Sequence, residues 1–144
     1  MNCDMIFKKC RQRMHVLYSL RAFHASGKII ERCYKAFVLP VLTFSMVCWF
    51  GSLNDKERKR LNGIVHVCEK IVGSSLQTLK DLYRVKSISK SNKIINESSH
   101  VLNYCFDLLP SRRRFRQLKF RTNRFRNTFI PNSINLLNSK KGSQ

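Results

Sequence analysis

Acidic residues are scarce in this chain of 144 residues, in which 8 Asp and Glu stand against 28 Lys and Arg and the formal net charge is +20. Such a surplus disfavours acidic or neutral small substrates, and it favours RNA, DNA or an anionic membrane surface as the partner. The surplus is uneven: residues 101–144 carry ten basic groups and one acidic group, whereas residues 61–100 carry six and three. The middle of the chain is therefore expected to be packed structure between two basic flanks.

The motifs of common enzyme classes are also missing. The chain has no G-x-G-x-x-G, no phosphate-binding loop, and no adjacent pair of Asp residues to hold the two metals of phosphoryl transfer. The four His residues are isolated, and none begins a His-x-Asp or His-x-x-x-His metal pattern. We expect no cofactor, no metal site and no catalytic residue, although a Cys nucleophile with partners distant in sequence stays open.

The six Cys residues lack the C-x-x-C spacing of a zinc site, and no basic start followed by an apolar stretch marks a signal peptide. Four of them fall among apolar neighbours, as buried free thiols do: Cys10, Cys33, Cys48 and Cys68. The pattern favours free thiols and a reducing intracellular compartment, with no choice between nucleus and cytoplasm.

Apolar residues recur at helical spacing along most of the chain, which predicts an all-α fold, a small helical bundle with an irregular basic C-terminal arm. The helices are expected near residues 5–24, 28–50, 54–72 and 78–96. The first is amphipathic, and its basic residues are candidates for nucleic-acid contact: Lys8, Lys9, Arg11 and Arg13.

Helix-end signals are clearest around the third helix. Asn54 and Glu57 have the spacing of a capping box, and Gly73 stands where the helix should stop. Pro131 stands where a short last helix could begin, with Ile134 and Leu137 able to pack back on the bundle. The expected division is a bundle over residues 1–107 and an arm over residues 108–144.

From Ala36, inside the second expected helix, to Asn54 the chain has nineteen residues without a charge, which is close to the length of a membrane span. Pro40 and Thr43 interrupt this run, and basic residues flank both ends, so no charge asymmetry orients it. A helix that is apolar all round can equally be the central element of a soluble bundle. We expect the soluble bundle, and the predicted partner is nucleic acid rather than a membrane or a small-molecule substrate.

Residues 112–126 carry the strongest functional signal, because eight of these fifteen residues are Arg or Lys, none is acidic, and Phe recurs every five residues. The phosphate backbone of a nucleic acid can neutralise such a segment, and interleaved aromatics can stack on unpaired bases. The Phe spacing suits neither a helix face nor a strand face, so an irregular arm, or one that folds on its partner, is expected. The candidate contacts are Arg112, Arg113, Arg114, Phe115, Arg116, Lys119, Phe120, Arg121, Arg124, Phe125 and Arg126.

Residues 29–50 resemble a segment that follows the polymerase palm in LINE-type (non-LTR) retrotransposon reverse transcriptases. Tyr34, Pro40, Leu42, Phe44 and Trp49 occupy the positions that carry this resemblance. The similarity continues in order along the chain, and covers most of residues 8–138, through residues 60–73, 78–83, 108–116, 122–126, 129–131 and 136–138.

In that family this region is the thumb and C-terminal segment, which implies a role in holding template and primer rather than in chemistry. The Tyr/Phe-x-Asp-Asp palm motif, the endonuclease domain and a Cys-Cys-His-Cys knuckle are absent from this sequence. The resemblance therefore implies a non-catalytic fragment that binds RNA or an RNA–DNA template–primer, and not a polymerase. A remnant that folds poorly and has no function is the alternative.

A second, shorter resemblance concerns Lys8–Leu17, which is similar to the basic N-terminal helix of AlkB-homologue tRNA-modifying dioxygenase–methyltransferase proteins. The His-x-Asp and distant His iron ligands of that family are missing, as is a Gly-rich methyl-donor loop. Membership of that family would thus be nominal, and at most a basic helix able to touch RNA is shared.

Overall fold

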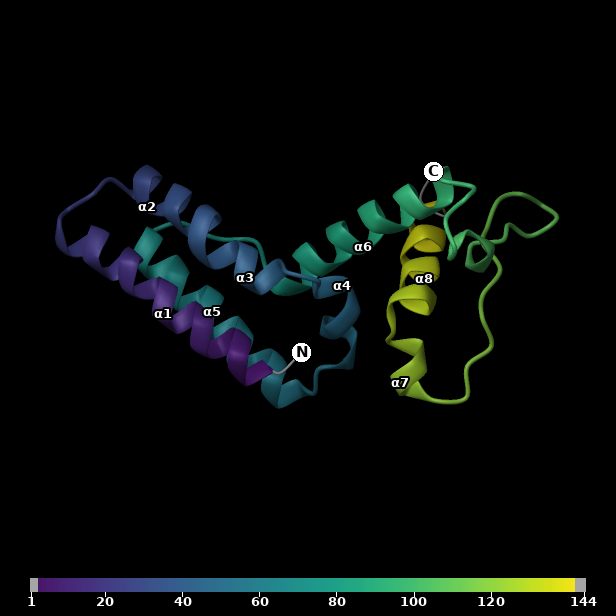
Figure 1. Ribbon diagram of the computed structural model, residues 1–144, viewed down its shortest axis with the longest axis horizontal. Helices are drawn as coiled ribbons and strands as arrows, with labels where there is room; N and C mark the ends of the chain where they lie inside the picture. The colour runs from purple at the N-terminus through teal and green to yellow at the C-terminus, as the bar shows by residue number, and fades with distance from the viewer. Residues whose placement is uncertain (1–2, 142–144) are drawn as a thin grey trace. The chain divides into compact units, whose positions relative to one another are not determined.

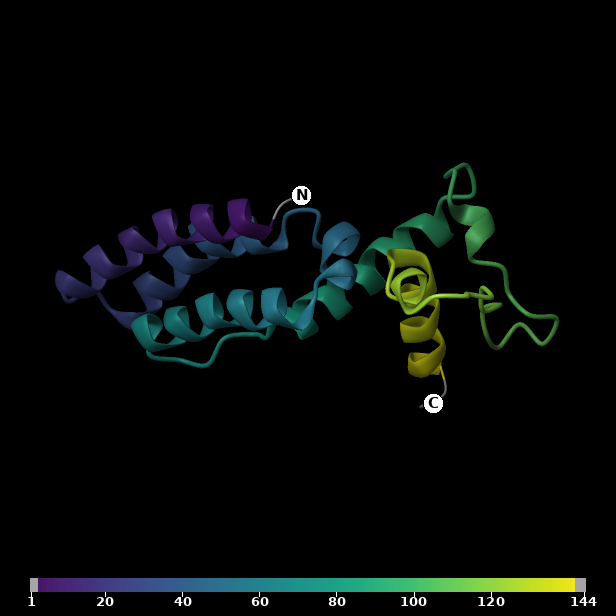
Figure 2. The ribbon, with the colours of Figure 1, turned by 90° about the horizontal axis from the view of Figure 1, so that it is seen from below.

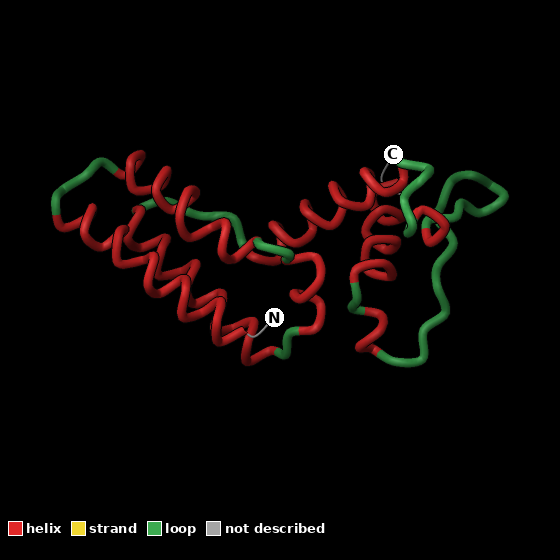
Figure 3. Tube along the Cα trace, in the orientation of Figure 1, coloured by secondary structure: helices red, strands yellow, loops and turns green. Residues whose placement is uncertain are grey.

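The computed structural model describes residues 3–141 and is built of helices, with no β-strand in that range (Figures 1 and 3). The prediction of an all-α fold is confirmed. The elements are α1 (Cys3–Ala22), α2 (Gly27–Cys33), a π-helical turn η1 (Tyr34–Val38), α3 (Leu39–Thr43), α4 (Met46–Trp49), a 3₁₀ turn η2 (Phe50–Ser52), α5 (Asp55–Val72), α6 (Leu79–Asn96), a 3₁₀ turn η3 (Asn103–Cys105), α7 (Asn123–Arg126) and α8 (Phe129–Lys141).

The contacts divide the described residues into two compact units. Unit 1 comprises residues 3–46 and 53–82, and unit 2 comprises residues 47–52 and 83–141. This division differs from the expected boundary after residue 107. The reason is that Ile94 and Phe106 share a hydrophobic core with Phe115, so residues 83–107 pack with the basic arm.

Unit 1 is a bundle of three helical layers, in which α1, α5 and the segment α2–η1–α3 pack against one another (Figure 2). Helix α1 buries residues spaced by three or four positions, as amphipathic helices do: Ile6, Cys10, Met14 and Leu17. The matching stripe on α5 is Leu61, Ile64, Val65, Cys68, Ile71 and Val72. The two stripes and the apolar side of α2–η1–α3 form the core of this unit.

Both ends of α5 have the structures that the sequence predicted. The Asn54 side chain accepts a hydrogen bond from the Glu57 backbone N–H at 2.8 Å, and the Glu57 carboxylate accepts one from the Asn54 N–H at 3.0 Å. Gly73 ends the helix in the left-handed conformation with φ of 80°. Glycine has no Cβ and adopts the left-handed conformation without steric strain. The change of backbone conformation at Gly73 ends the helix.

The second predicted helix is interrupted rather than continuous. Its middle turn, η1, is π-helical, and the Leu39 N–H donates to the Tyr34 carbonyl five residues earlier. Pro40 explains the interruption, because it has no N–H to donate and its ring would clash with the carbonyl four residues before it. Tyr34 and Trp49 are buried.

The stretch Gly27–Ser52 is long and apolar enough to cross a membrane by length and composition alone. The core helix of a soluble protein has the same properties. Within unit 1, Ile30, Val38 and Leu42 have no exposed surface, and their helical segments pack against α1. One side of this stretch thus lies in the unit 1 core, whereas Ile29, Phe37 and Phe44 are exposed and only 39% of its most apolar window is buried.

Unit 2 is organised around α6 and α8, whose side chains meet in one hydrophobic cluster. Its buried members are Ile94, Phe106, Phe115, Ile134 and Leu137. The chain turns after α6 because the Asn103 side-chain amide donates to the Ile94 carbonyl at 2.9 Å and to the Ile95 carbonyl at 3.1 Å. The expected last helix is present, although it begins at Phe129, two residues before Pro131.

All six Cys residues are free thiols, but not all four of the predicted ones are buried. Cys10 and Cys68 lie in the unit 1 core, Cys33 is half-buried, and Cys48 is exposed. The prediction for Cys48 is wrong because apolar sequence neighbours do not fix which side of a short helix faces the core. Burial raises the pKa of the Cys10 thiol to about 12 and that of Cys68 to about 11.

These raised pKa values predict selective alkylation. Thiolate is the reactive form, and Cys10 and Cys68 stay neutral until the pH is far above 9. In the native protein at pH 8, iodoacetamide should modify Cys48 and leave Cys10 and Cys68 unmodified, whereas all three should react in urea. Peptide mass spectrometry measures this, and modification of Cys10 as fast as Cys48 would contradict the packing of α1 on α5.

Candidate nucleic-acid interface

Because Phe129–Lys141 form helix α8, the name arm is kept below for residues 108–128 alone. The structure places the candidate residues of the arm on the surface of unit 2, with one exception. Ten of the eleven are exposed: Arg112, Arg113, Arg114, Arg116, Lys119, Phe120, Arg121, Arg124, Phe125 and Arg126. Phe115 is only 6% exposed and belongs to the hydrophobic core. The prediction that its ring stacks on bases is therefore wrong, because the ring is already packed inside the protein.

The backbone around Phe115 explains how the arm is held. The Asn138 side chain on α8 accepts from the Phe115 N–H at 2.8 Å and donates to the Phe115 carbonyl at 3.0 Å. The ring of Phe115 meets that of Phe106 edge-on, with centroids 6.3 Å apart. Two hydrogen bonds and one buried ring thus fix the middle of the basic segment to the last helix.

Before this anchor, the chain folds back on itself in a short hairpin-like loop. The Leu109 N–H donates to the Arg114 carbonyl and the Arg116 N–H donates to the Asp107 carbonyl, each at 2.8 Å. Arg112 turns the chain with φ of 54°, in the left-handed region. The loop therefore presents Arg112 and Arg113 at a turn between two stretches of backbone that are hydrogen-bonded to each other.

After the anchor, the arm is mostly irregular, as predicted, but residues 123–126 form the short helix α7. Thr122 caps this helix, because its hydroxyl accepts a hydrogen bond from the Phe125 N–H at 3.3 Å. The guanidinium carbon of Arg126 lies 5.7 Å from the centroid of the Phe120 ring, within the range of a cation–π contact. Helix α7 thus brings a cation and an aromatic ring of the arm together.

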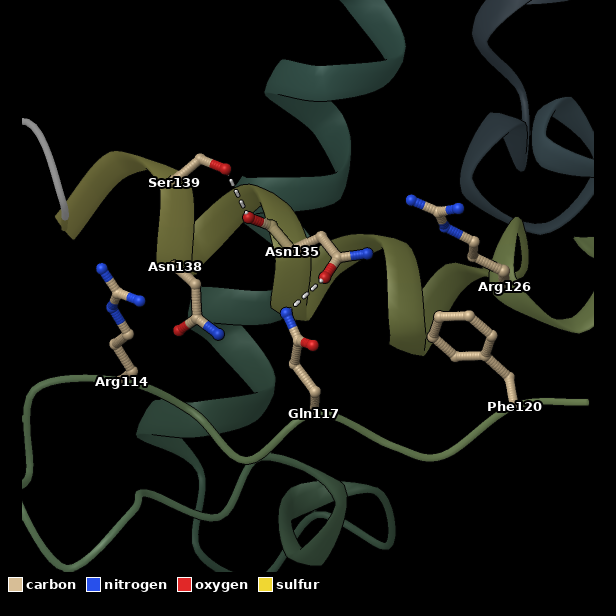
Figure 4. A pocket seen from close by; sticks show the side chains of 7 residues that line it. All are labelled: Arg114, Gln117, Phe120, Arg126, Asn135, Asn138 and Ser139. Atoms are coloured by element: carbon tan, nitrogen blue, oxygen red, sulfur yellow. Dashed lines mark hydrogen bonds between the residues drawn. The ribbon is translucent and has the colours of Figure 1, made fainter.

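The arm and α8 line an open pocket of about 490 Å³ (Figure 4). Its lining combines three predicted residues with four polar ones that sequence reasoning missed: Arg114, Phe120 and Arg126, and Gln117, Asn135, Asn138 and Ser139. Figure 4 shows Arg114 at one end, Phe120 and Arg126 at the other, and the two amides of Gln117 and Asn135 between them. The lining contains no carboxylate.

The missed residues had a sequence signal. Asn135, Asn138 and Ser139 are spaced by three and four positions, which places them on one face of a helix. That face is polar and adjoins the apolar face carried by Ile134 and Leu137. Helical spacing could therefore have assigned these residues to one surface, but not the arm that covers it.

The cations of the arm are not neutralised by the protein. Within the described residues, none of the eight Arg and Lys side chains of residues 112–126 forms an ion pair with a carboxylate. The positive potential of this surface is therefore available to an external anion.

The candidates on α1 belong to unit 1. Lys8 and Lys9 are exposed without a partner in the described residues, but Arg13 donates to the Phe37 carbonyl at 2.9 Å. The guanidinium carbon of Arg11 lies 5.5 Å from the centroid of the Phe7 ring. Arg13 therefore has a structural role, and the case for nucleic-acid contact on α1 is weaker than for the arm.

No group of three His, Cys, Asp or Glu residues among residues 3–141 is placed to hold a metal ion. No family model matches the chain, and neither a curated protein nor a solved structure is detectably similar to it.

Proposed function

We propose that this protein is a non-catalytic nucleic-acid-binding module that contacts phosphates through the basic arm of unit 2. The observation that carries the proposal is the exposure of eight cations within fifteen residues, with no carboxylate partner in the described chain. Seven of the eight are Arg, whose planar guanidinium group matches phosphate with two donors and also stacks on rings.

The origin we propose is the thumb and C-terminal region of a LINE-type reverse transcriptase. Support comes from three of the five residues that carry the resemblance: Tyr34, Leu42 and Trp49 are buried and therefore have the packing role expected of a scaffold, whereas Phe44 is exposed. The stretch 60–73 lies almost wholly in the core helix α5 and its Gly73 cap. Polymerase activity is not proposed, because the sequence contains no palm motif.

The test is a titration of RNA and DNA oligonucleotides against salt. Binding through phosphates releases counterions, so log affinity should fall linearly with log salt concentration. Replacing Arg112, Arg113 and Arg114 with Gln should lower the slope by about 2 to 3, since each phosphate contact contributes about 0.7 on single strands and about 0.9 on B-DNA.

A matched control removes the same number of charges from another surface of unit 2. Lys86, Lys90 and Lys93 on α6 are exposed, and their replacement with Gln changes the net charge by the same three units. This variant should keep the slope of the parent protein. Equal slopes for the two triple variants would show that net charge rather than the arm governs binding.

A further inference from the structure

Within the proposed function, on which this inference rests, the pocket between the arm and α8 points to a more specific ligand. We infer that it holds one unpaired nucleotide of a single-stranded nucleic acid. The base would lie on the Phe120 ring, and the phosphates on either side of it would lie at Arg114 and Arg126. The chemistry of the lining supports each part of this assignment.

The size and the charges fit a nucleotide. A volume of about 490 Å³ lies within the range of about 300–1,000 Å³ that small-ligand sites occupy. Figure 4 shows a cation at each end of the pocket, so an anionic backbone entering at one end and leaving at the other meets a guanidinium group twice. The lining contains no carboxylate to repel that backbone.

The aromatic ring supplies a surface for stacking. Phe120 is 39% exposed and lines the pocket, and Arg126 lies 5.7 Å from the centroid of its ring. Any base can stack on such a ring, because every base has a π-face, and the neighbouring guanidinium group adds a cation–π contribution. Phe125 is similarly exposed, at 44%, but does not line the pocket.

The middle of the pocket offers hydrogen bonds to a base edge. The Gln117 side-chain amide donates to the Asn135 side-chain carbonyl at 3.0 Å. This bond uses the Gln117 side-chain N–H and the Asn135 side-chain oxygen. The Gln117 side-chain oxygen, an acceptor, and the Asn135 side-chain NH₂ group, a donor, have no partners in the described residues. The edge of an unpaired base presents a donor beside an acceptor, which complements this pair.

The pocket is built before any ligand arrives. Asn138 is occupied by its two hydrogen bonds to the Phe115 backbone, so its role is to hold the arm against α8. A preformed site avoids the entropic cost of ordering a loop on binding. Because a paired base has its faces covered by neighbours and its edge bonded to its partner, it cannot enter, and the pocket should select single strands over duplexes.

The experiment compares two RNA probes with 24 nucleotides each, a single-stranded oligouridylate and a blunt duplex of 12 base pairs, by fluorescence anisotropy at one salt concentration. Phe120→Leu should weaken binding of the single strand by about 5- to 150-fold, which is the range for loss of one base–aromatic stack, and should leave duplex binding unchanged. Phe125→Leu is the matched comparison: its ring is exposed in the arm but lies outside the pocket, so it should weaken single-strand binding less than Phe120→Leu does.

A second pair of variants separates the pocket from net charge. Arg114→Gln and Arg113→Gln remove one charge each from adjacent positions, but only Arg114 lines the pocket. Both should weaken duplex binding equally, and Arg114→Gln should weaken single-strand binding more than Arg113→Gln does.

The two proposals fail in different ways. Parent protein that binds neither probe at low salt would overturn the proposed function itself. Parent protein that binds both probes, with Phe120→Leu equal to Phe125→Leu and Arg114→Gln equal to Arg113→Gln on the single strand, would keep phosphate binding by the arm. That result would remove the unpaired nucleotide from the pocket.

Discussion

Replacing Phe115 with alanine should lower the free energy of unfolding by about 3–4 kcal/mol, as removal of a buried Phe ring does in other protein cores. The ring is 6% exposed and packs edge-on against Phe106 in the cluster that includes Ile94 and Ile134. Its loss leaves a cavity that the surrounding helices can fill only in part. Urea denaturation followed by circular dichroism measures the change.

The same substitution distinguishes the two roles that Phe115 could have. A ring that stacked on bases would be exposed in the free protein, so its removal would weaken nucleic-acid binding and leave stability unchanged. Phe125→Ala provides the control, since that exposed side chain should change the free energy of unfolding by no more than about 0.5 kcal/mol. Equal melting of the two variants would contradict the core position of Phe115. A parent protein with no cooperative transition would instead support the non-functional remnant.

The helices were predictable because their signals are local. The apolar stripe on α5 repeats at three and four residues, and the Asn54–Glu57 box and Gly73 mark its ends within the same segment. Pro40 was visible as an interruption, but whether the chain would kink, break or form a π-helical turn depends on packing around it. Local patterns therefore gave the elements but not their internal irregularities.

The pocket was only half predictable, because its two sides are far apart in the sequence. Phe115, Phe120 and Phe125 have the same spacing and similar basic neighbours, so nothing local separates the buried ring from the exposed ones. The difference arises from Asn138 and Phe106, which lie 23 residues after and 9 residues before Phe115. The clustering of Arg and Lys predicted that residues 112–126 form a basic surface. Contacts between segments distant in sequence determine which of these residues can reach a ligand.

A pair of glycine-to-alanine substitutions should have opposite effects on stability. In unit 2, a Cβ added at Gly51 would overlap the carbonyl oxygen of Asn127 and lie 3.3 Å from the Tyr83 hydroxyl. The obstacle is backbone, which no side-chain rotation can move, so Gly51→Ala should cost about 1–3 kcal/mol. In unit 1, a Cβ at Gly63 meets nothing within 4 Å. Gly63→Ala in α5 should therefore add about 0.5–1 kcal/mol through helix propensity.

Gly51→Ala should also change the geometry of the pocket, because Asn127 directly follows the pocket residue Arg126. Displacing the Asn127 backbone should move the Arg126 guanidinium group away from the Phe120 ring, and single-strand binding should weaken while Gly63→Ala leaves it unchanged. Denaturation curves and anisotropy titrations of the two variants measure both effects. Gly51→Ala with the stability and the affinity of the parent would show that residues 47–52 do not pack on Asn127. The position of Arg126 in the pocket would then depend only on contacts between the arm and α8. The Asn138 hydrogen bonds to Phe115, made twelve residues after Arg126, would have to position it.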